Sequence, residues 1–160
     1  MLLTSCVAIT FGPSAPEASA KRPWPVTATC PTPARSAAYA AEVLALMNGH
    51  RAKAGLPPLV ASTAVARVAH LYACEIAARG EISHTGSDGS TLTERLARGG
   101  ISADFAAENT ASGQKNPAEL VAAWMASPGH RANILRPAAR ALGLGLADSA
   151  RTYWVANFTS

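Results

Sequence analysis

The chain has 160 residues, of which 49% are hydrophobic, and this is enough for one domain with a substantial buried core. Its formal net charge of +4 comes mostly from scattered arginines, so the charge is too weak and too dispersed to indicate nucleic-acid binding. No stretch of the sequence is long and apolar enough to predict a transmembrane segment.

The first twenty residues are interpreted as a signal segment. A short apolar stretch is followed by small residues and ends in Ala18-Ser19-Ala20, which fits a signal-peptidase site, although a basic leading region is missing. The run Leu3-Thr4-Ser5-Cys6 also reads like a lipoprotein box, which would place a lipid anchor on Cys6. We therefore expect a secreted or periplasmic protein, with a lipoprotein as the open alternative.

Residues 21–33 are rich in proline and predict an extended arm, so the domain itself is expected at residues 34–160. If Cys6 is removed or lipidated, Cys30 and Cys74 remain as an even pair in an oxidising compartment. We predict that they form a disulfide that ties the arm to a helix. The alternative is two unpaired thiols, with Cys74 as a small buried apolar residue.

Helical signals come first in the domain. Thr32-Pro33 is a favourable opening for a helix that runs to Gly55, and the prolines that follow enforce an extended segment. Ser62 caps a second amphipathic helix. Residues 83–90 are almost all turn formers, and a short third helix closed by Gly99 follows them.

The second half of the domain mixes strands with short helices. Residues 106–113 predict a strand that leads into a turn. Asn116 is followed at once by a proline and three residues later by Glu119, which predicts a fourth helix. Ser127-Pro128 opens a short helical turn, and two alternating strands joined by a hairpin at 148–151 end the domain. The pattern predicts an α+β fold in which helices cover a small antiparallel sheet.

Two of the four histidines lie where a scaffold presents functional side chains. His84 and His130 each sit in a short polar or Gly/Pro-punctuated segment. His50 and His70 lie inside predicted helices, where a surface or hydrogen-bonded histidine is the ordinary interpretation. The first pair is therefore the candidate for chemistry.

Acidic residues near these histidines complete a candidate cleft. Glu94 lies on the first turn of the third helix, and Glu108 precedes Asn109. Two imidazoles and two carboxylates can bind a divalent metal such as zinc, or act as an acid/base pair whose carboxylates orient the imidazoles. Spacing along the chain does not by itself bring the four together.

Several collinear segments resemble the bacterial branch of the CAP superfamily (cysteine-rich secretory proteins, antigen 5, pathogenesis-related 1). The most specific is Ser-Pro-Gly-His-Arg-Ala-Asn-Ile-Leu at 127–135, and the resemblance extends over about residues 37–158. The other matching segments are 48–51, 55–59, 83–85, 88–90, Glu108-Asn109, Trp124 and 153–155.

The resemblance implies a three-layer α-β-α sandwich with a central cleft. It carries two histidines and two acids onto His84, Glu94, Glu108 and His130, with the histidines as metal ligands and with Asn109 supporting the cleft. The sequence departs from the family at Thr110, where an apolar residue is usual, and at Arg131, where eukaryotic members have tyrosine.

Three functions stay open at this point. The first is a monomeric extracellular binding module for a divalent metal, a small polar ligand, a lipid or an extracellular protein. The second is a hydrolase that uses the metal or a serine, for which Ser83, Ser87 and Ser127 are the candidates, although none lies in a nucleophile elbow. The third is a structural or protein-interaction role, in which Glu108 and Asn109 form hydrogen bonds with backbone groups and His130 is buried beside Trp124.

Overall fold

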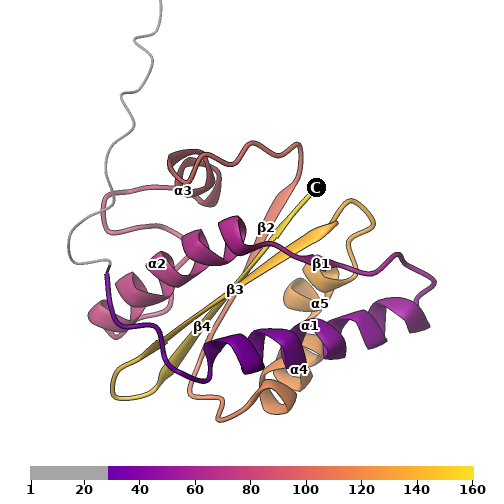
Figure 1. The fold of residues 1–160 in the computed structure, drawn as a ribbon, viewed down its shortest axis with the longest axis horizontal. Coiled ribbons are helices and arrows are strands. Elements are labelled where there is room, and N and C mark those ends of the chain that lie inside the picture. The colour runs from indigo at the N-terminus through magenta and orange to yellow at the C-terminus, as the bar shows by residue number, and fades with distance from the viewer. Residues whose placement is uncertain (1–28) are drawn as a thin grey trace, which may run out of the picture.

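The computed structural model of the chain describes residues 29–160. The signal segment at 1–20, most of the arm and the fate of Cys6 lie outside the described residues. The elements follow one another in the order α1 (Ser36–Lys53), β1 (Val60–Ala61), α2 (Thr63–Arg79), α3 (Leu92–Arg98), β2 (Ala106–Ser112), α4 (Pro117–Ala126), α5 (Pro128–Ile134), β3 (Ala141–Asp148) and β4 (Thr152–Thr159) (Figure 1).

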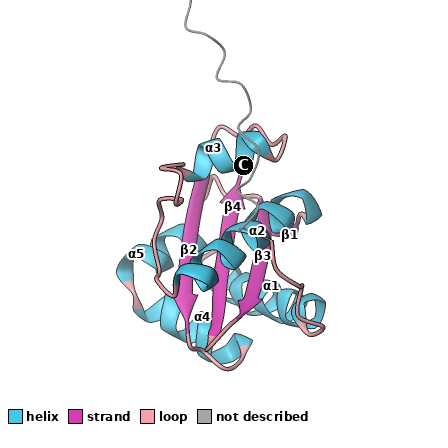
Figure 2. Cartoon of the chain, turned by 90° about the vertical axis from the view of Figure 1, so that its left-hand side faces the viewer, coloured by secondary structure: helices cyan, strands magenta, loops and turns pink. Residues whose placement is uncertain are grey.

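The sheet has four strands in the order β1-β3-β4-β2 (Figure 2). The predicted antiparallel pairing is confirmed for β2 with β4 and for the hairpin of β3 with β4. β1 was not predicted as a strand, and it pairs in parallel with β3 through Val60 and Ala141. The sheet is therefore mixed, with β2 at one edge.

Helices cover both faces of this sheet, as predicted. Leu142, Leu144 and Leu146 point from β3 into the core formed with α1, α4 and α5. The glycines between these leucines face α2. A Cβ atom on Gly143 would lie 2.2 Å from Ala66 N, so α2 packs its backbone directly against the strand. The alternation of leucine and glycine thus builds the α-β-α sandwich.

Local capping explains most helix boundaries. The Ser62 hydroxyl accepts a hydrogen bond from Val65 N at the start of α2, and the Asn116 side chain accepts one from Glu119 N at the start of α4. The expected start of α1 at Thr32-Pro33 was too early, because the helix begins at Ser36 after a turn. Ser127 precedes α5 as predicted, but its side chain makes no capping hydrogen bond.

The predicted disulfide between Cys30 and Cys74 is confirmed, with the two Cα atoms 5.5 Å apart. It fastens the segment before α1 to the middle of α2. Within residues 29–160, no helix combines the length and the apolar character that crossing a bilayer requires.

Candidate functional site

The candidate cleft lies at the β2 edge of the sheet. Glu108 is on β2, His84 is on the loop between α2 and α3, and His130 is on α5. Figure 2 shows β2 at the edge of the sheet with α5 beside it. These three candidates therefore come from three separate parts of the chain.

Glu108 is the centre of the hydrogen bonding. Its side chain is only 3% exposed, and its Oε1 lies 2.9 Å from Nδ1 of His84, whose side chain is 59% exposed. A carboxylate oxygen only accepts, so Nδ1 carries the proton of this bond. In the neutral imidazole Nε2 then keeps its lone pair, which is free for another proton or a metal ion.

Arg95 supplies the other partner of Glu108 and was missed by the sequence analysis. Its guanidinium is fully buried, donates to Glu108 Oε2 at 2.8 Å, and lies 3.6 Å from the centre of the Tyr72 ring. It also donates to the carbonyl oxygens of His84 and Ser90, which bracket the loop. Its position beside Leu96 on the buried side of α3 was the available signal, because a charge there needs a partner.

Glu94 does not reach these residues. Its carboxylate accepts hydrogen bonds from Thr91 N at 2.8 Å and from Thr91 Oγ1 at 3.0 Å, which completes a capping box at the start of α3. Adjacent helical residues point about 100° apart, so Arg95 faces the interior while Glu94 faces solvent. Within residues 29–160, no hydrogen bond or ion pair joins Glu94 to His84, Glu108 or His130.

His130 is carried by α5, which packs beside β2. Its ring centre is 6.4 Å from that of Trp124, and its carbonyl oxygen accepts a hydrogen bond from the Asn109 side chain at 3.1 Å. Asn133 donates to Asn109 Oδ1 at 2.9 Å and to the carbonyl oxygen of Glu108 at 3.3 Å. The two asparagines thus fasten α5 to β2 and fix where His130 lies.

The two imidazoles have opposite protonation tendencies. The hydrogen bond that His84 donates to Glu108 is the main reason why the pKa of His84 is raised above its usual 6.5. Burial, followed by the charge on His84, lowers the pKa of His130. Such a separation favours a protonated imidazole on the loop and a neutral one on α5.

The serines proposed as nucleophiles lack a base. Ser83 Oγ donates to the carbonyl oxygen of Thr85 and accepts from Thr85 N, so it serves the turn. Across residues 29–160, no hydrogen bond joins a serine hydroxyl to His84 or His130. The geometry provides no nucleophile–base pair of the serine-hydrolase type.

A cavity of about 450 Å³ opens beside the exposed imidazole. It is lined by His84, Thr85, Thr91, Leu92, Ala106, Ala107 and Glu108. Among residues 29–160, one group of three potential metal ligands lies within 4.8 Å of one another, and it consists of Cys30, His70 and Cys74. The cleft has no such group among these residues. A metal ion in the cleft would therefore have few protein ligands and several open positions.

The fold and the cleft define an α-β-α sandwich domain with two histidines beside its edge strand β2. The sequence profile of the cysteine-rich secretory protein family, CAP, matches residues 44–158, and the chain belongs to this family.

Known relatives agree with that assignment. The uncharacterized protein YkwD of Bacillus subtilis (strain 168) is 34% identical over 130 residues, which are 81% of this chain and 50% of YkwD. An extracellular protein containing a SCP domain from Bacillus anthracis str. Ames has 27% identity and a TM-score of 0.71, over 82% of this chain and 44% of that one. The chain thus spans about half the length of these two relatives.

The same fold occurs in a more distant protein. An outer surface protein from Borrelia burgdorferi has 22% identity and a TM-score of 0.72, over 77% of this chain and 92% of that one.

Proposed function

We propose that this protein is an extracellular binding domain whose cleft holds a divalent metal ion through His84 and His130. The hydrogen bond of His84 Nδ1 to Glu108 carries the proposal, because it holds the exposed imidazole by Nδ1 and leaves the Nε2 lone pair for a metal ion. Metal-binding histidines have this kind of partner on their other nitrogen. The descriptions of the Bacillus anthracis and Borrelia proteins as extracellular and outer surface proteins support the location.

The donor set fits a weakly held, accessible metal. The lowered pKa of His130 keeps its imidazole neutral near pH 7, and this is the form that binds metals. At His84, whose pKa is raised, the metal ion has to displace a proton from Nε2. Two histidines leave coordination positions for water or for a ligand, which the cavity beside His84 can admit. When bound, such a metal supplies Lewis acidity toward a carbonyl or water, which is the route for the alternative hydrolase function.

Calorimetric titration of the chelator-stripped, disulfide-bonded chain with zinc tests the proposal. We expect micromolar binding that the double variant His84→Ala/His130→Ala loses and that the control His50→Ala on α1 retains. Circular dichroism checks that each variant is folded. Absence of zinc binding by the wild-type chain, or binding that the double variant keeps, would overturn the metal site.

A second observation favours a lipid as the ligand. Two adjoining cavities of about 370 and 270 Å³ lie between α1, α2 and the edge of β3, and their shared lining includes Ala37, Ala40, Ala66 and Leu144. This apolar groove suits an acyl chain better than a polar ligand. Binding of a fluorescent fatty acid that Ala40→Trp abolishes and that His84→Ala leaves unchanged would favour this function over metal binding.

A further inference from the structure

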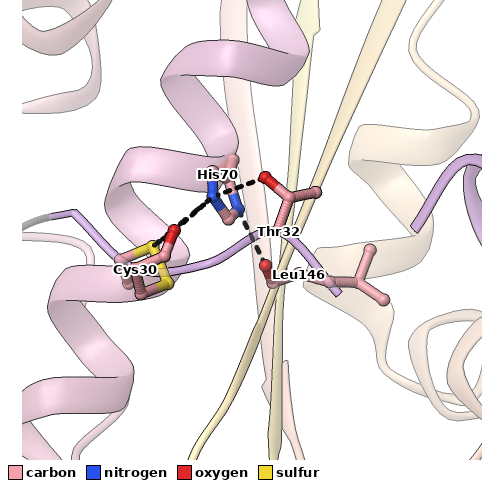
Figure 3. The surroundings of a disulfide bond; sticks show 5 residues. Cys30, Thr32, His70 and Leu146 are labelled. Carbon is pink, nitrogen blue, oxygen red and sulfur yellow. Dashed lines mark hydrogen bonds between the residues drawn. A yellow bond between two sulfur atoms is a disulfide. The ribbon is translucent and has the colours of Figure 1, made fainter. Parts of the chain in front are cut away.

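Cys30, His70 and Cys74 form a second cluster of potential ligands, apart from the cleft (Figure 3). His70 and Cys74 are four residues apart on α2 and therefore lie on the same side of the helix. Cys30 reaches them from the segment before α1, to which the disulfide joins Cys74. Cys30 and His70 are half-buried, so solvent and metal ions have access to the cluster.

The orientation of His70 is that of a metal ligand. Nδ1 lies 2.8 Å from the carbonyl oxygen of Leu146, which only accepts, so this nitrogen carries the proton. Nε2 then presents its lone pair to the cysteines, 3.7 Å from Cys74 Sγ (Figure 3). A backbone carbonyl on one nitrogen fixes the tautomer of ligating histidines in the same way.

One contact of Nε2 is unfavourable in the neutral tautomer. Nε2 lies 3.2 Å from the carbonyl oxygen of Cys30 as well as 3.1 Å from Thr32 Oγ1. The hydroxyl can donate to the lone pair, but the carbonyl cannot, so two acceptors face each other in the neutral tautomer. A cation at Nε2 removes this unfavourable contact.

The distances suit a tetrahedral metal. With bonds of about 2.3 Å to sulfur and about 2.0 Å to nitrogen, neighbouring ligand atoms of tetrahedral zinc are about 3.5–3.8 Å apart. The separation of Cys74 Sγ and His70 Nε2 already has this value, and all three ligand atoms lie within 4.8 Å of one another. The two sulfur atoms have to part, which breaking the disulfide allows.

We propose that the reduced chain binds zinc or a similar metal ion through Cys30, Cys74 and His70, and that the disulfide and the metal are alternative occupants of this cluster. In the test, a phosphine reduces the disulfide with one water molecule, so that the phosphine becomes its oxide and each sulfur gains a proton. The metal then displaces both thiol protons to solvent as two metal–thiolate bonds form. Water or the Thr32 hydroxyl takes the fourth position.

Cobalt(II) titration of the full chain tests this site, since thiolate ligands give an ultraviolet sulfur-to-cobalt charge-transfer band. A Cys6→Ser background removes the third cysteine of the sequence. We expect the band in the reduced chain and its absence in the oxidised chain. In reduced His70→Gln the affinity for cobalt should be at least tenfold weaker, within the 10- to 100-fold range for weakened coordination. His50→Gln is the matched control and should keep the full affinity.

The outcome is independent of the cleft. The His84→Ala/His130→Ala variant should retain the charge-transfer band, because neither residue supplies sulfur or contacts the cluster. Circular dichroism records whether the reduced chain is folded before and after metal is added. The proposal would be overturned if the reduced chain showed no charge-transfer band. It would also be overturned if the reduced His70→Gln variant, folded or unfolded, gave an equally strong band.

Discussion

The buried pair of Arg95 and Glu108 is the feature of the cleft whose removal has the most predictable cost. Arg95→Met keeps an apolar side chain against Tyr72 but removes the buried cation that pairs with Glu108 Oε2. The carboxylate, on a side chain that is 3% exposed, then keeps its hydrogen bond from His84 without this cation. Breaking a buried ion pair costs about 3–5 kcal/mol, whereas an exposed pair contributes about 1 kcal/mol or less. We therefore expect Arg95→Met to lower the free energy of unfolding by about 3–5 kcal/mol.

Urea unfolding followed by fluorescence of the buried Trp124 and Trp154 measures this loss. Arg35→Met is the matched control, since Arg35 bridges Asp148 with its side chain 40% exposed, and it should cost about 1 kcal/mol or less. If the stranded carboxylate causes the loss, adding Glu108→Gln to Arg95→Met recovers part of it. A cost of about 1 kcal/mol for Arg95→Met, or additive effects of the two substitutions, would refute the reasoning.

Three further expectations rest on separate features. Gly145→Ala should lower the free energy of unfolding in urea by about 1–3 kcal/mol or more, because its Cβ would lie 2.2 Å from the α2 backbone. Gly49→Ala is the control and should be neutral or stabilising, because a Cβ at this position of α1 meets open space. Cys30→Ser should cost about 4 kcal/mol in the chain-entropy description of a disulfide across 44 residues, measured against the oxidised wild type. His84→Gln should lower the free energy of unfolding mainly in acid. The raised pKa of His84 in the folded state means that its protonation stabilises the fold fully below pH 6.5 and not above the raised pKa, so urea unfolding over a pH series should show a larger loss at low pH than at high pH.

Sequence features that act between residues close together in the chain, such as helix caps and strand alternation, predicted the fold well. Ser62 and Asn116 marked helix starts because a side chain capping its own helix needs no distant partner. The alternation of leucine and glycine in β3 likewise showed a strand directly. β1 escaped prediction because its two residues become a strand only by pairing with Ala141, about eighty positions away along the chain.

The site was predicted less completely, because the residue of α3 that reaches the cleft is the neighbour of the one that was expected. An acid was expected from α3, and Glu94 fitted the resemblance. Helix geometry turns that side chain outward to cap α3 and turns Arg95 inward onto Glu108. Residue type did not decide between them, because an arginine in a short amphipathic helix is usually solvated. The position of Arg95 beside Leu96 was the one available signal, and the packing against Tyr72 shows that Arg95 is buried.

This arrangement makes the shape of the cleft depend on the core. Arg95 donates to the carbonyl oxygens of His84 and Ser90, so one buried guanidinium holds both ends of the loop that carries the exposed imidazole. The same guanidinium fixes the carboxylate that orients that imidazole. Loop position and imidazole orientation therefore respond together to any change in how α3 packs. A substitution on the buried side of α3, such as Leu96→Ala, should therefore weaken the metal binding that we propose for the cleft, as zinc titration would measure. Leu96 itself is 3% exposed and belongs to a core cluster with Val65 and Val68.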